Sequence, residues 1–303
     1  MWVQYLNQIQ EGNIKSLARA ISLIENEVGG YEELLQLLPA SNTPIIGITG
    51  PPGAGKSTLT DALIGELVGL QKSIAILCVD PSSPFNLGAL LGDRIRMSEW
   101  YNNPAVYIRS LATRGALGGL HPKIIEISDL LKAACFDYII IETVGVGQSE
   151  IEIAGLADAT VVVMVPEAGD EVQTMKAGLM EIADLFVVNK SDRPDADSFV
   201  KNLRLMLAPA FHKKEIPVQV IKTVALKKTG IAEMLAAIQQ CLLHTTGPGQ
   251  QAQRNERHWW LLAEKAYYLL QKKRMKDIDK AMLKKNIETA GNNFNLYRFI
   301  QKL

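Results

Sequence analysis

Residues 44–68, PIIGITGPPGAGKSTLTDALIGELV, decide the fold of this 303-residue chain. They begin with a short apolar run, pass through a glycine-rich loop and continue as a helical pattern. The loop GPPGAGKST fits G-x-x-x-x-G-K-[ST], in which glycines let successive backbone N–H groups point towards a phosphate. The amino end of the following helix adds positive potential. A strand, this loop and a helix in this order predict a site for a nucleoside triphosphate.

Two side chains of this loop have expected roles. Lys56 is predicted to reach the β- and γ-phosphates, and the Ser57 hydroxyl is predicted to ligate Mg²⁺. The alternative is a chance glycine turn before a helix, and the complete strand, loop and helix context argues against it. The predicted phosphate-binding residues are Gly50, Gly53, Ala54, Gly55, Lys56, Ser57 and Thr58.

Outward from this stretch, between Pro44 and about Cys241, short β-branched runs alternate with helical segments. Continuous apolar runs separated by helices are what a parallel sheet buried on both faces requires. The runs are PIIGITG, SIAILCVD, AVYIRS, FDYIIIET, ATVVVMVP, ADLFVVNKSD and VQVIKTVA. We therefore predict an α/β fold over residues 44–246, with a mostly parallel central sheet flanked by helices.

The two flanks have different patterns. Residues 1–43 predict an amphipathic helical extension, in which Leu17, Ile21 and Leu23 lie near one face. From Thr245, the stretch TTGPGQQAQRNE is rich in Gly, Pro and Gln and predicts a linker. Residues 247–303 are therefore expected to hold the linker and a C-terminal helical element, with one stripe formed by Trp259, Ala263, Ala266 and Leu270.

Composition and charge restrict the class of protein. A hydrophobic content of 48% with 21% charged residues predicts a soluble globular protein, and the formal net charge of +0 argues against attraction to nucleic acid or membrane. From Pro248 onward there are 12 Lys/Arg against 5 Asp/Glu. This basic tail could bind RNA or anionic lipid, but a solvated face on a packing or dimerisation element is the favoured interpretation.

The amino end, the lengths of the apolar runs and the spacing of the cysteines indicate where in the cell the protein is expected. The amino end has no apolar segment behind a basic start, and no apolar run approaches the ~20 residues that span a bilayer. Cys78, Cys135 and Cys241 are odd in number and far apart, which favours buried thiols over a disulfide frame or a metal site. We expect a cytoplasmic protein with no membrane or nucleic-acid partner.

The stretch FVVNKSD at residues 186–192 predicts the base. It ends an apolar run with Asn189, Lys190 and Asp192, the N-K-x-D arrangement of GTP-binding proteins. A carboxylate such as that of Asp192 accepts hydrogen bonds from the N1–H and the exocyclic amine of guanine, and adenine has no such donor pair. The Lys190 stem is expected over the base, and Asn189 is expected to tie this loop to the phosphate loop. GTP is therefore favoured over ATP.

A second base contact is expected after the next apolar run, in TVALKKTGI at residues 223–231. GTP-binding proteins place here a backbone N–H that contacts the guanine carbonyl, and Ala225 is our candidate. The usual signature begins Ser-Ala, so Val224 is a departure that a backbone contact tolerates. The predicted residues of this loop are Val224, Ala225 and Leu226.

Three acids follow apolar runs where the metal is expected. Mg²⁺ takes oxygen ligands in octahedral geometry, and we predict that Asp80, Asp93 and Glu142 join Ser57 around it. Lys56, Asp93 and Glu142 are the predicted catalytic residues. The alternative for each acid is an ordinary strand-end or turn residue. Arginines 94, 96 and 114 rank second as groups that stabilise transition-state charge.

The glycine loop after Glu142 is expected to sense the γ-phosphate. In IIIETVGVGQSE, Gly145 lacks a Cβ, so its N–H can close on that phosphate. Such a loop would be ordered around the triphosphate and relax after hydrolysis.

Six segments together resemble the methylmalonyl-CoA mutase-associated GTPases, a family also labelled as arginine/ornithine (LAO/AO) transport ATPases. They are ETVGVGQSE, VDPSSP, LLGDRIRM, RSLATRGALGGL, VQTMKAGLMEIADLFVVNKSD and LARAISLIENE, and the likeness spans about residues 12–245. The resemblance implies nucleotide and magnesium positions at Lys56, Ser57, Asp80, Asp93 and Glu142. It implies guanine contacts at Asn189, Lys190 and Asp192.

The resemblance also implies a function and partners. Such proteins are GTP-dependent chaperones that gate adenosylcobalamin delivery to an acyl-CoA mutase and release damaged cofactor. The segment from Pro166 to Lys176 would couple nucleotide state to the mutase, with Asp170 and Lys176 as polar contacts. Glu167-Ala168 and Asn86-Leu87 depart from forms common in the family. A homodimer through the C-terminal helical element is expected.

Other functions remain open at this point. A nickel-insertion GTPase would carry a cysteine or histidine cluster, which this sequence lacks. A P-loop kinase would need an acceptor site, and the guanine loop argues against ATP as donor. A nucleotide-stabilised dimer without turnover is a third alternative. No D-x-H-x-x-G cobalamin motif is present, so a structural or surface role is expected for His121, His212, His244 and His258.

Overall fold

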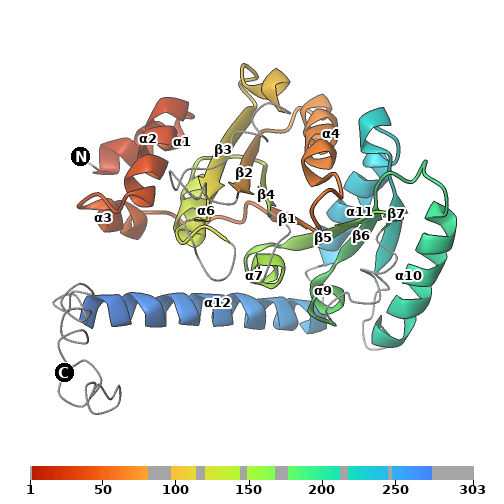
Figure 1. The fold of residues 1–303 in the computed structure, drawn as a ribbon. Coiled ribbons are helices and arrows are strands. Elements are labelled where there is room, and N and C mark those ends of the chain that lie inside the picture. The colour runs from red at the N-terminus through yellow and green to blue at the C-terminus, as the bar shows by residue number, and fades with distance from the viewer. Residues whose placement is uncertain are drawn as a thin grey trace, which may run out of the picture. The chain divides into compact units, whose positions relative to one another are not determined.

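The computed structural model describes residues 2–80, 97–113, 120–143, 149–167, 177–211, 218–244 and 248–274. The chain forms two compact units, residues 1–258 and residues 259–303. Within the first unit, the described residues form the predicted α/β fold, a seven-stranded sheet between helices (Figure 1). All strand pairs are parallel.

The sheet has the strand order β3-β2-β4-β1-β5-β6-β7. Each apolar run of the sequence forms one strand, which confirms the predicted fold class. The strands are β1 (Ile45–Thr49), β2 (Ile74–Asp80), β3 (Val106–Ala112), β4 (Tyr138–Glu142), β5 (Ala159–Met164), β6 (Leu185–Val188) and β7 (Gln219–Lys222). Because the strands are parallel, their carboxyl ends meet at one edge of the sheet, where ligands bind in open α/β sheets.

Helices cover both faces of the sheet. On one face, alternate strand residues such as Ile46 and Ile48 pack against α4 (Lys56–Gly69) and α11 (Ile231–His244). On the other, residues such as Val162 and Phe186 pack against α7 (Ser149–Leu156), α9 (Ala177–Ile182) and α10 (Ala196–Phe211). Burial of both faces explains why the strands read as unbroken apolar runs.

The central strand β1 fixes the position of α7. Gly47, in the middle of β1, would place a Cβ only 2.7 Å from Ile153 Cγ1 of α7. Glycine therefore lets this helix approach the sheet closely, and any larger residue would displace it.

The N-terminal extension forms three helices, α1 (Trp2–Gln10), α2 (Ile14–Glu25) and α3 (Tyr31–Gln36). The side chain of Asn13 caps α2 by accepting a hydrogen bond from the Ser16 N–H at 3.0 Å. Leu17 and Ile21 lie on the buried face as predicted, but Ile24 completes that face and Leu23 is only half-buried. The helical period explains this, since Ile24 is three residues after Ile21 and Leu23 only two.

Charged side chains attach this extension to the sheet at a junction that we call the N-terminal junction, formed by Glu25, Glu27, Tyr31, Arg109, Lys123 and Glu126. Arg109 of β3 pairs with Glu25 of α2. Lys123, just before α6 (Ile124–Ala133), lies 3.0 Å from Glu27 and 3.5 Å from Glu126, and donates to the Tyr31 hydroxyl at 2.9 Å.

The environment of Lys123 favours its charged form. Burial lowers the pKa of Lys123, but its hydrogen bonds to Tyr31 and Glu27 and the charge of Glu126 outweigh burial and raise the pKa above its usual 10.5. The folded state therefore holds this proton more tightly than the unfolded state. The stabilisation is complete at neutral pH and is lost only as the pH rises above 10.5 towards the folded-state pKa.

A single tryptophan within the sheet domain ties a further segment to α4. Trp100, in the short helix η1 (Ser98–Trp100), donates its indole N–H to Asp61 Oδ1 at 2.7 Å. Its ring packs against the core cluster between α4 and the sheet. Asp61 is four residues after Ser57 on the same helix.

The C-terminal boundary differs from the expected one. Residues 248–256 were predicted as linker, but they form the first turns of α12 (Pro248–Arg274). Pro248 occupies the first helical position, where proline is favoured because its missing N–H has no intrahelical partner to lose. The stripe predicted on this helix includes the exposed Trp259 and Leu270. No helix within the described ranges is long and apolar enough to cross a bilayer.

The N-terminal junction makes a stability prediction. Replacing Lys123 by Met should lower the free energy of unfolding by about 2–3 kcal/mol, because Glu126 stays buried without its cationic partner. Urea unfolding would measure this. The matched control is Lys72→Met, which breaks an exposed pair with Asp137 and should cost less than about 1 kcal/mol. Equal losses in the two variants would contradict the prediction.

Candidate functional site

The phosphate loop connects β1 to α4 with a backbone that requires glycine. Gly50 has a φ of 139°, and a Cβ there would lie 2.1 Å from the Val163 carbonyl oxygen of β5. Gly55 has a φ of 85°, and a Cβ there would lie 2.5 Å from Asn189 Nδ2. L side chains rarely adopt such angles, so both positions depend on glycine. Among the other predicted loop residues, Gly53 also has a positive φ, Ala54 is fully buried and Thr58 is half-buried in the first turn of α4.

Lys56 is held against this loop. Its Nζ donates to the carbonyl oxygens of Gly50, at 2.9 Å, and Pro51, at 3.1 Å. The side chain is buried, and these two hydrogen bonds fix the position of its ammonium group. This arrangement places an ammonium group along the loop whose N–H groups are expected to bind phosphate.

Glu142 lies beside the first turn of α4. It is the last residue of β4 and pairs in register with Ile48 of β1, which brings it next to the phosphate loop. Ser57 Oγ donates to Glu142 Oε1 at 2.6 Å, and Thr60 Oγ1 lies 3.0 Å from Glu142 Oε2. The Glu142 side chain is buried. The structure thus brings together two of the four predicted metal-binding residues, and adds one residue that sequence analysis missed.

Thr60 lies beyond the phosphate-loop motif, and its only sequence signal is its spacing from Ser57. It is three residues after Ser57, so both hydroxyls lie on the same helix face. A motif search stops at Thr58, and only the pairing of β4 with β1 shows that this face meets an acid.

The oxygen donors fit a magnesium ion. A hydroxyl and a carboxylate beside a phosphate loop are the ligand types that Mg²⁺ prefers. Asp80 ends β2, at the same edge of the sheet, since Cys78 of β2 pairs with Glu142. The side chain of Asp80, all of Asp93 and Gly145, and arginines 94, 96 and 114 lie outside the described residues.

Asn189 joins three loops at the other end of the site. Its Nδ2 donates to the Ala54 carbonyl at 2.9 Å, which is the expected tie to the phosphate loop. Its Oδ1 accepts from Thr223 Oγ1 at 3.2 Å and from the Ala225 N–H at 3.1 Å. The side chain is buried. All three loops are therefore held together by one amide.

The neighbouring residues of the guanine loop are more exposed. Lys190 Nζ donates to the Gly53 carbonyl at 2.7 Å, so its stem follows the phosphate loop. Asp192 forms an ion pair with Lys227 at 2.8 Å, and the hydrogen bond from Lys227 lowers the pKa of Asp192. Asp192 is thus an acceptor at neutral pH, as the recognition of guanine requires.

The loop after β7 contains the candidate backbone contact. Ala225 begins the short helix η2 (Ala225–Lys227) and is buried, whereas Leu226 is 87% exposed. The N–H of Ala225 already donates to Asn189. Its predicted contact with a guanine carbonyl would therefore share or replace this hydrogen bond. The Val224 N–H donates to the Thr229 carbonyl, so the departure at Val224 leaves the loop closed.

One end of the segment expected to couple nucleotide state to the partner makes a described contact. Of the segment from Pro166 to Lys176, the structure describes Pro166 and Glu167, so Asp170 and Lys176 lie outside. Glu167 pairs with Arg193, which lowers the pKa of Glu167 and joins this segment to the residue after Asp192.

Two adjacent residues of α12 contact the carboxyl-terminal ends of two other helices. His258 Nδ1 donates to the Gly155 carbonyl of α7 at 3.0 Å, and Arg257 donates to the Glu181 carbonyl of α9 at 2.9 Å. Helix α7 follows the glycine loop after Glu142, and α9 follows the segment that ends at Lys176. The helices that follow both loops are therefore contacted by adjacent residues of α12. The sequence predicted a structural or surface role for His258 and singled out no role for Arg257.

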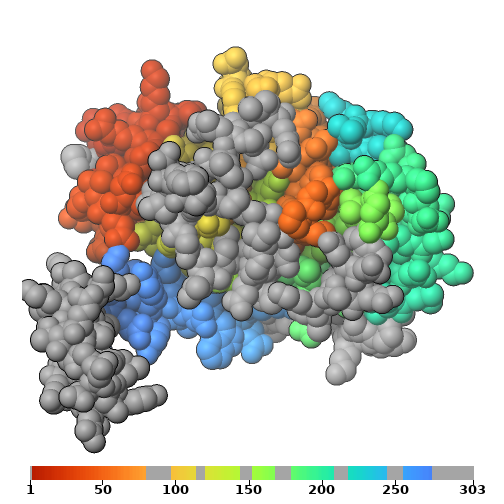
Figure 2. Space-filling view, in the orientation of Figure 1, coloured from red at the N-terminus to blue at the C-terminus, as the bar shows by residue number. Residues whose placement is uncertain are grey.

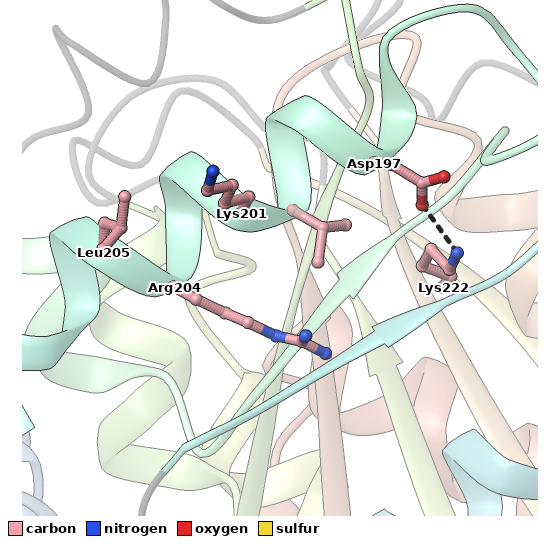
Figure 3. Close-up of a pocket in the computed structure, with 6 residues that line it drawn as sticks. Asp197, Lys201, Arg204, Leu205 and Lys222 are labelled. Atoms are coloured by element: carbon pink, nitrogen blue, oxygen red, sulfur yellow. Dashed lines mark hydrogen bonds and ion pairs between the residues drawn. The ribbon is translucent and has the colours of Figure 1, made fainter.

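A separate cavity lies between α10 and β7, with a volume of about 340 Å³ (Figure 3). Its polar groups are largely engaged within the protein, because Asp197 pairs with Lys222 at 2.8 Å and Arg204 donates to the Val220 carbonyl. Lys201 points away from these groups in Figure 3. This cavity contains no residue of the nucleotide site.

Comparisons with known proteins identify a family model, related sequences and a solved structure that are similar to this chain. The family model described as "Methylmalonyl Co-A mutase-associated GTPase MeaB" matches residues 17–278. A protein of Pyrococcus abyssi described as a GTPase is 45% identical over 242 residues, which are 78% of this chain and 75% of that protein. The fused isobutyryl-CoA mutase of Geobacillus kaustophilus is 40% identical over 204 residues, 63% of this chain and 19% of that protein. The crystal structure of an LAO/AO transport system kinase aligns with a TM-score of 0.70 and 27% identity, over 99% of this chain and 95% of that one.

The guanine loop makes a selectivity prediction. Replacing Asp192 by Ala should weaken GDP binding by about 100-fold, because two hydrogen bonds to a carboxylate are lost. ADP binding should not change, so the preference for guanine would collapse. Competition against a fluorescent guanine nucleotide would measure both affinities.

The matched control is Asp197→Ala. Asp197 is also exposed and also pairs with a lysine at 2.8 Å, but it lies outside the guanine loop. This variant should keep the full preference for GDP. An unchanged preference in the Asp192 variant would remove Asp192 from base recognition.

Proposed function

Since the chain belongs to the methylmalonyl-CoA mutase-associated GTPase family and is a GTPase, we propose that it gates adenosylcobalamin loading of an acyl-CoA mutase. In the same role it would protect or reactivate that enzyme. The observation that carries the proposal is the buried Glu142 carboxylate, which contacts the first turn of α4. The glycine loop that is expected to sense the γ-phosphate follows Glu142 directly in the chain. A nucleotide-dependent change at this carboxylate is transmitted directly to the chain that follows it.

The side chains have distinct roles in the proposed reaction. Lys56 neutralises charge on the β- and γ-phosphates, and the loop N–H groups hold these phosphates in place. Ser57, Asp80, Asp93 and Glu142 would hold Mg²⁺, which would supply neutralisation of phosphate charge. Glu142 also orients the attacking water, and the Gly145 N–H contacts the γ-phosphate.

Base recognition is preorganised by the protein. Asn189 holds the guanine loop, the phosphate loop and the loop after β7 in one arrangement. Asp192 then accepts hydrogen bonds from the base, while Lys190 lies over it. GTP and GDP are the proposed ligands.

The contacts of the switch segments support a route to the partner. The ion pair between Glu167 and Arg193 joins the segment from Pro166 to Lys176 to the guanine loop. His258 and Arg257 join α7 and α9, the helices that follow both switch segments. We propose that ordering of these segments around GTP changes the surface that the mutase contacts, with Asp170 and Lys176 among its polar contacts.

The partner proposal has one independent support. In Geobacillus kaustophilus, a region 40% identical to this chain is part of a fused isobutyryl-CoA mutase. A fusion places the two parts at high effective concentration. A separate chain of the same family would need a surface for the corresponding contact.

A homodimer is proposed through α12. Within the unit formed by residues 259–303, this helix exposes large apolar side chains, namely Trp259, Trp260, Tyr267, Tyr268 and Leu270. Exposed apolar groups of this size mark interaction surfaces.

The proposed catalytic role of Glu142 is testable by an isosteric change. Glu142→Gln should lower GTP turnover by about 100-fold or more, because a charge placed for the transition state is lost. GDP binding should persist. The matched control is Glu126→Gln, a buried carboxylate of the N-terminal junction, which should leave turnover unchanged. Normal turnover in the Glu142 variant would exclude this residue from the chemistry.

The partner is tested by turnover with and without a cobalamin-dependent acyl-CoA mutase of the same organism. Intrinsic GTP hydrolysis should be slow, and the mutase should accelerate it, with about 10³–10⁵-fold as the full effect of completing such a site. ATP serves as the control nucleotide. GTP turnover that the mutase does not change would overturn the partner, and preferential ATP use would overturn the base assignment.

A further inference from the structure

We infer that Thr60 is a positioning residue for Glu142 and that it sets the affinity of the nucleotide site for Mg²⁺. This inference rests on the proposed function, because it assigns a role within the same GTP site. Thr60 lies outside the phosphate-loop motif, and its hydroxyl is expected to act through Glu142 without contacting the substrate.

The two oxygens of Glu142 are held by two hydroxyls from one helix face. Ser57 Oγ lies 2.6 Å from Oε1, and Thr60 Oγ1 lies 3.0 Å from Oε2. All three side chains are buried, and Thr60 is fully so. With one hydroxyl on each oxygen, the two contacts together restrain the rotation of the carboxylate plane.

The Thr60 hydroxyl has two acceptors within reach but only one proton. Besides Glu142, it lies 3.0 Å from the Lys56 carbonyl oxygen. That carbonyl already accepts the N–H of Thr60 as part of the helix. Loss of the hydroxyl therefore matters little to Lys56. A buried carboxylate has a much larger need, since hydrogen bonds to charged groups are about twice as strong as neutral ones.

This second contact gains importance when Ser57 ligates Mg²⁺. The Ser57 oxygen would then also bind the metal ion, and the orientation of its hydroxyl would depend on that ion as well as on Glu142. Thr60 contacts the other carboxylate oxygen, so its hydrogen bond does not compete with that ligation. Thr60 thereby keeps Glu142 in the orientation that faces the first turn of α4.

Three variants of this chain test the role. Thr60→Val keeps the shape of the side chain and removes the hydroxyl, and Thr60→Ser restores it. The matched control is Ser128→Ala, because Ser128 is also fully buried and also donates to the carbonyl four residues earlier in its helix, at 2.7 Å, in α6. This control removes the same kind of hydroxyl-to-carbonyl hydrogen bond within a helix, but the described contact of this hydroxyl is to a carbonyl and not to a carboxylate.

The measurement is the dissociation rate of a fluorescent GDP as a function of free Mg²⁺, together with the melting temperature. In the Thr60→Val variant, the free Mg²⁺ concentration at which the GDP dissociation rate is halfway between its Mg²⁺-free and Mg²⁺-saturated values should rise by about tenfold. This corresponds to about 1.4 kcal/mol. Dissociation in excess EDTA should match that of the unmodified protein. Thr60→Ser and Ser128→Ala should both stay within about twofold of the unmodified protein in Mg²⁺ dependence.

Each outcome is decisive. If the Mg²⁺ dependence of GDP dissociation is the same in Thr60→Val as in the unmodified protein, the positioning role is overturned and the proposed function is left intact. A shift that is equal in Ser128→Ala, or that Thr60→Ser does not restore, would show a loss of packing and also overturn it. Absence of Mg²⁺-dependent guanine nucleotide binding in the unmodified protein would overturn the proposed function itself.

Discussion

The hydrogen bond between Ser57 and Glu142 joins the two chain segments on which the rest of the site depends. Strand β1 delivers the phosphate loop and β4 delivers the acid, and their parallel pairing brings both to one edge of the sheet. A carboxylate at this depth is unfavourable unless it is well hydrogen-bonded, since burial without partners costs several kcal/mol. Retaining such a group at the end of the phosphate-binding edge is consistent with a role in binding a metal ion and a nucleotide.

Asn189 provides the second connection, and it is of a different kind. Its amide is neutral and buried, and it bonds to the phosphate loop, to Thr223 and to Ala225. Gly55 completes the fit, because any side chain there would occupy the space of the Asn189 amide. The charged connection fixes the metal end of the site and the neutral one fixes the base end. These contacts hold Ala54 of the phosphate loop and Ser57 in the first turn of α4.

The strands were predictable because burial on both faces gives an unbroken apolar run, and the phosphate loop was predictable because glycine is required by its backbone. Most of the omissions involve contacts between distant parts of the chain, whereas the error at residues 248–256 is local. Arg109 meets Glu25 across 84 residues, and His258 meets Gly155 across 103. No local pattern contains such pairs. Thr60 was missed since its partner depends on strand order, and the linker at residues 248–256 was wrong because a proline that breaks most helices also starts them.

Trp100 has a consequence for observing this molecule. It is the only tryptophan between residues 44 and 246, since the other three lie at positions 2, 259 and 260. Its indole N–H is fixed by Asp61, one helical turn beyond Ser57, and its ring lies against the core beneath α4. The emission of an indole depends on its hydrogen bonding and on the polarity around it. Once Trp2, Trp259 and Trp260 are replaced by Phe, the remaining emission comes from Trp100 beside α4 and reports on this part of the sheet domain.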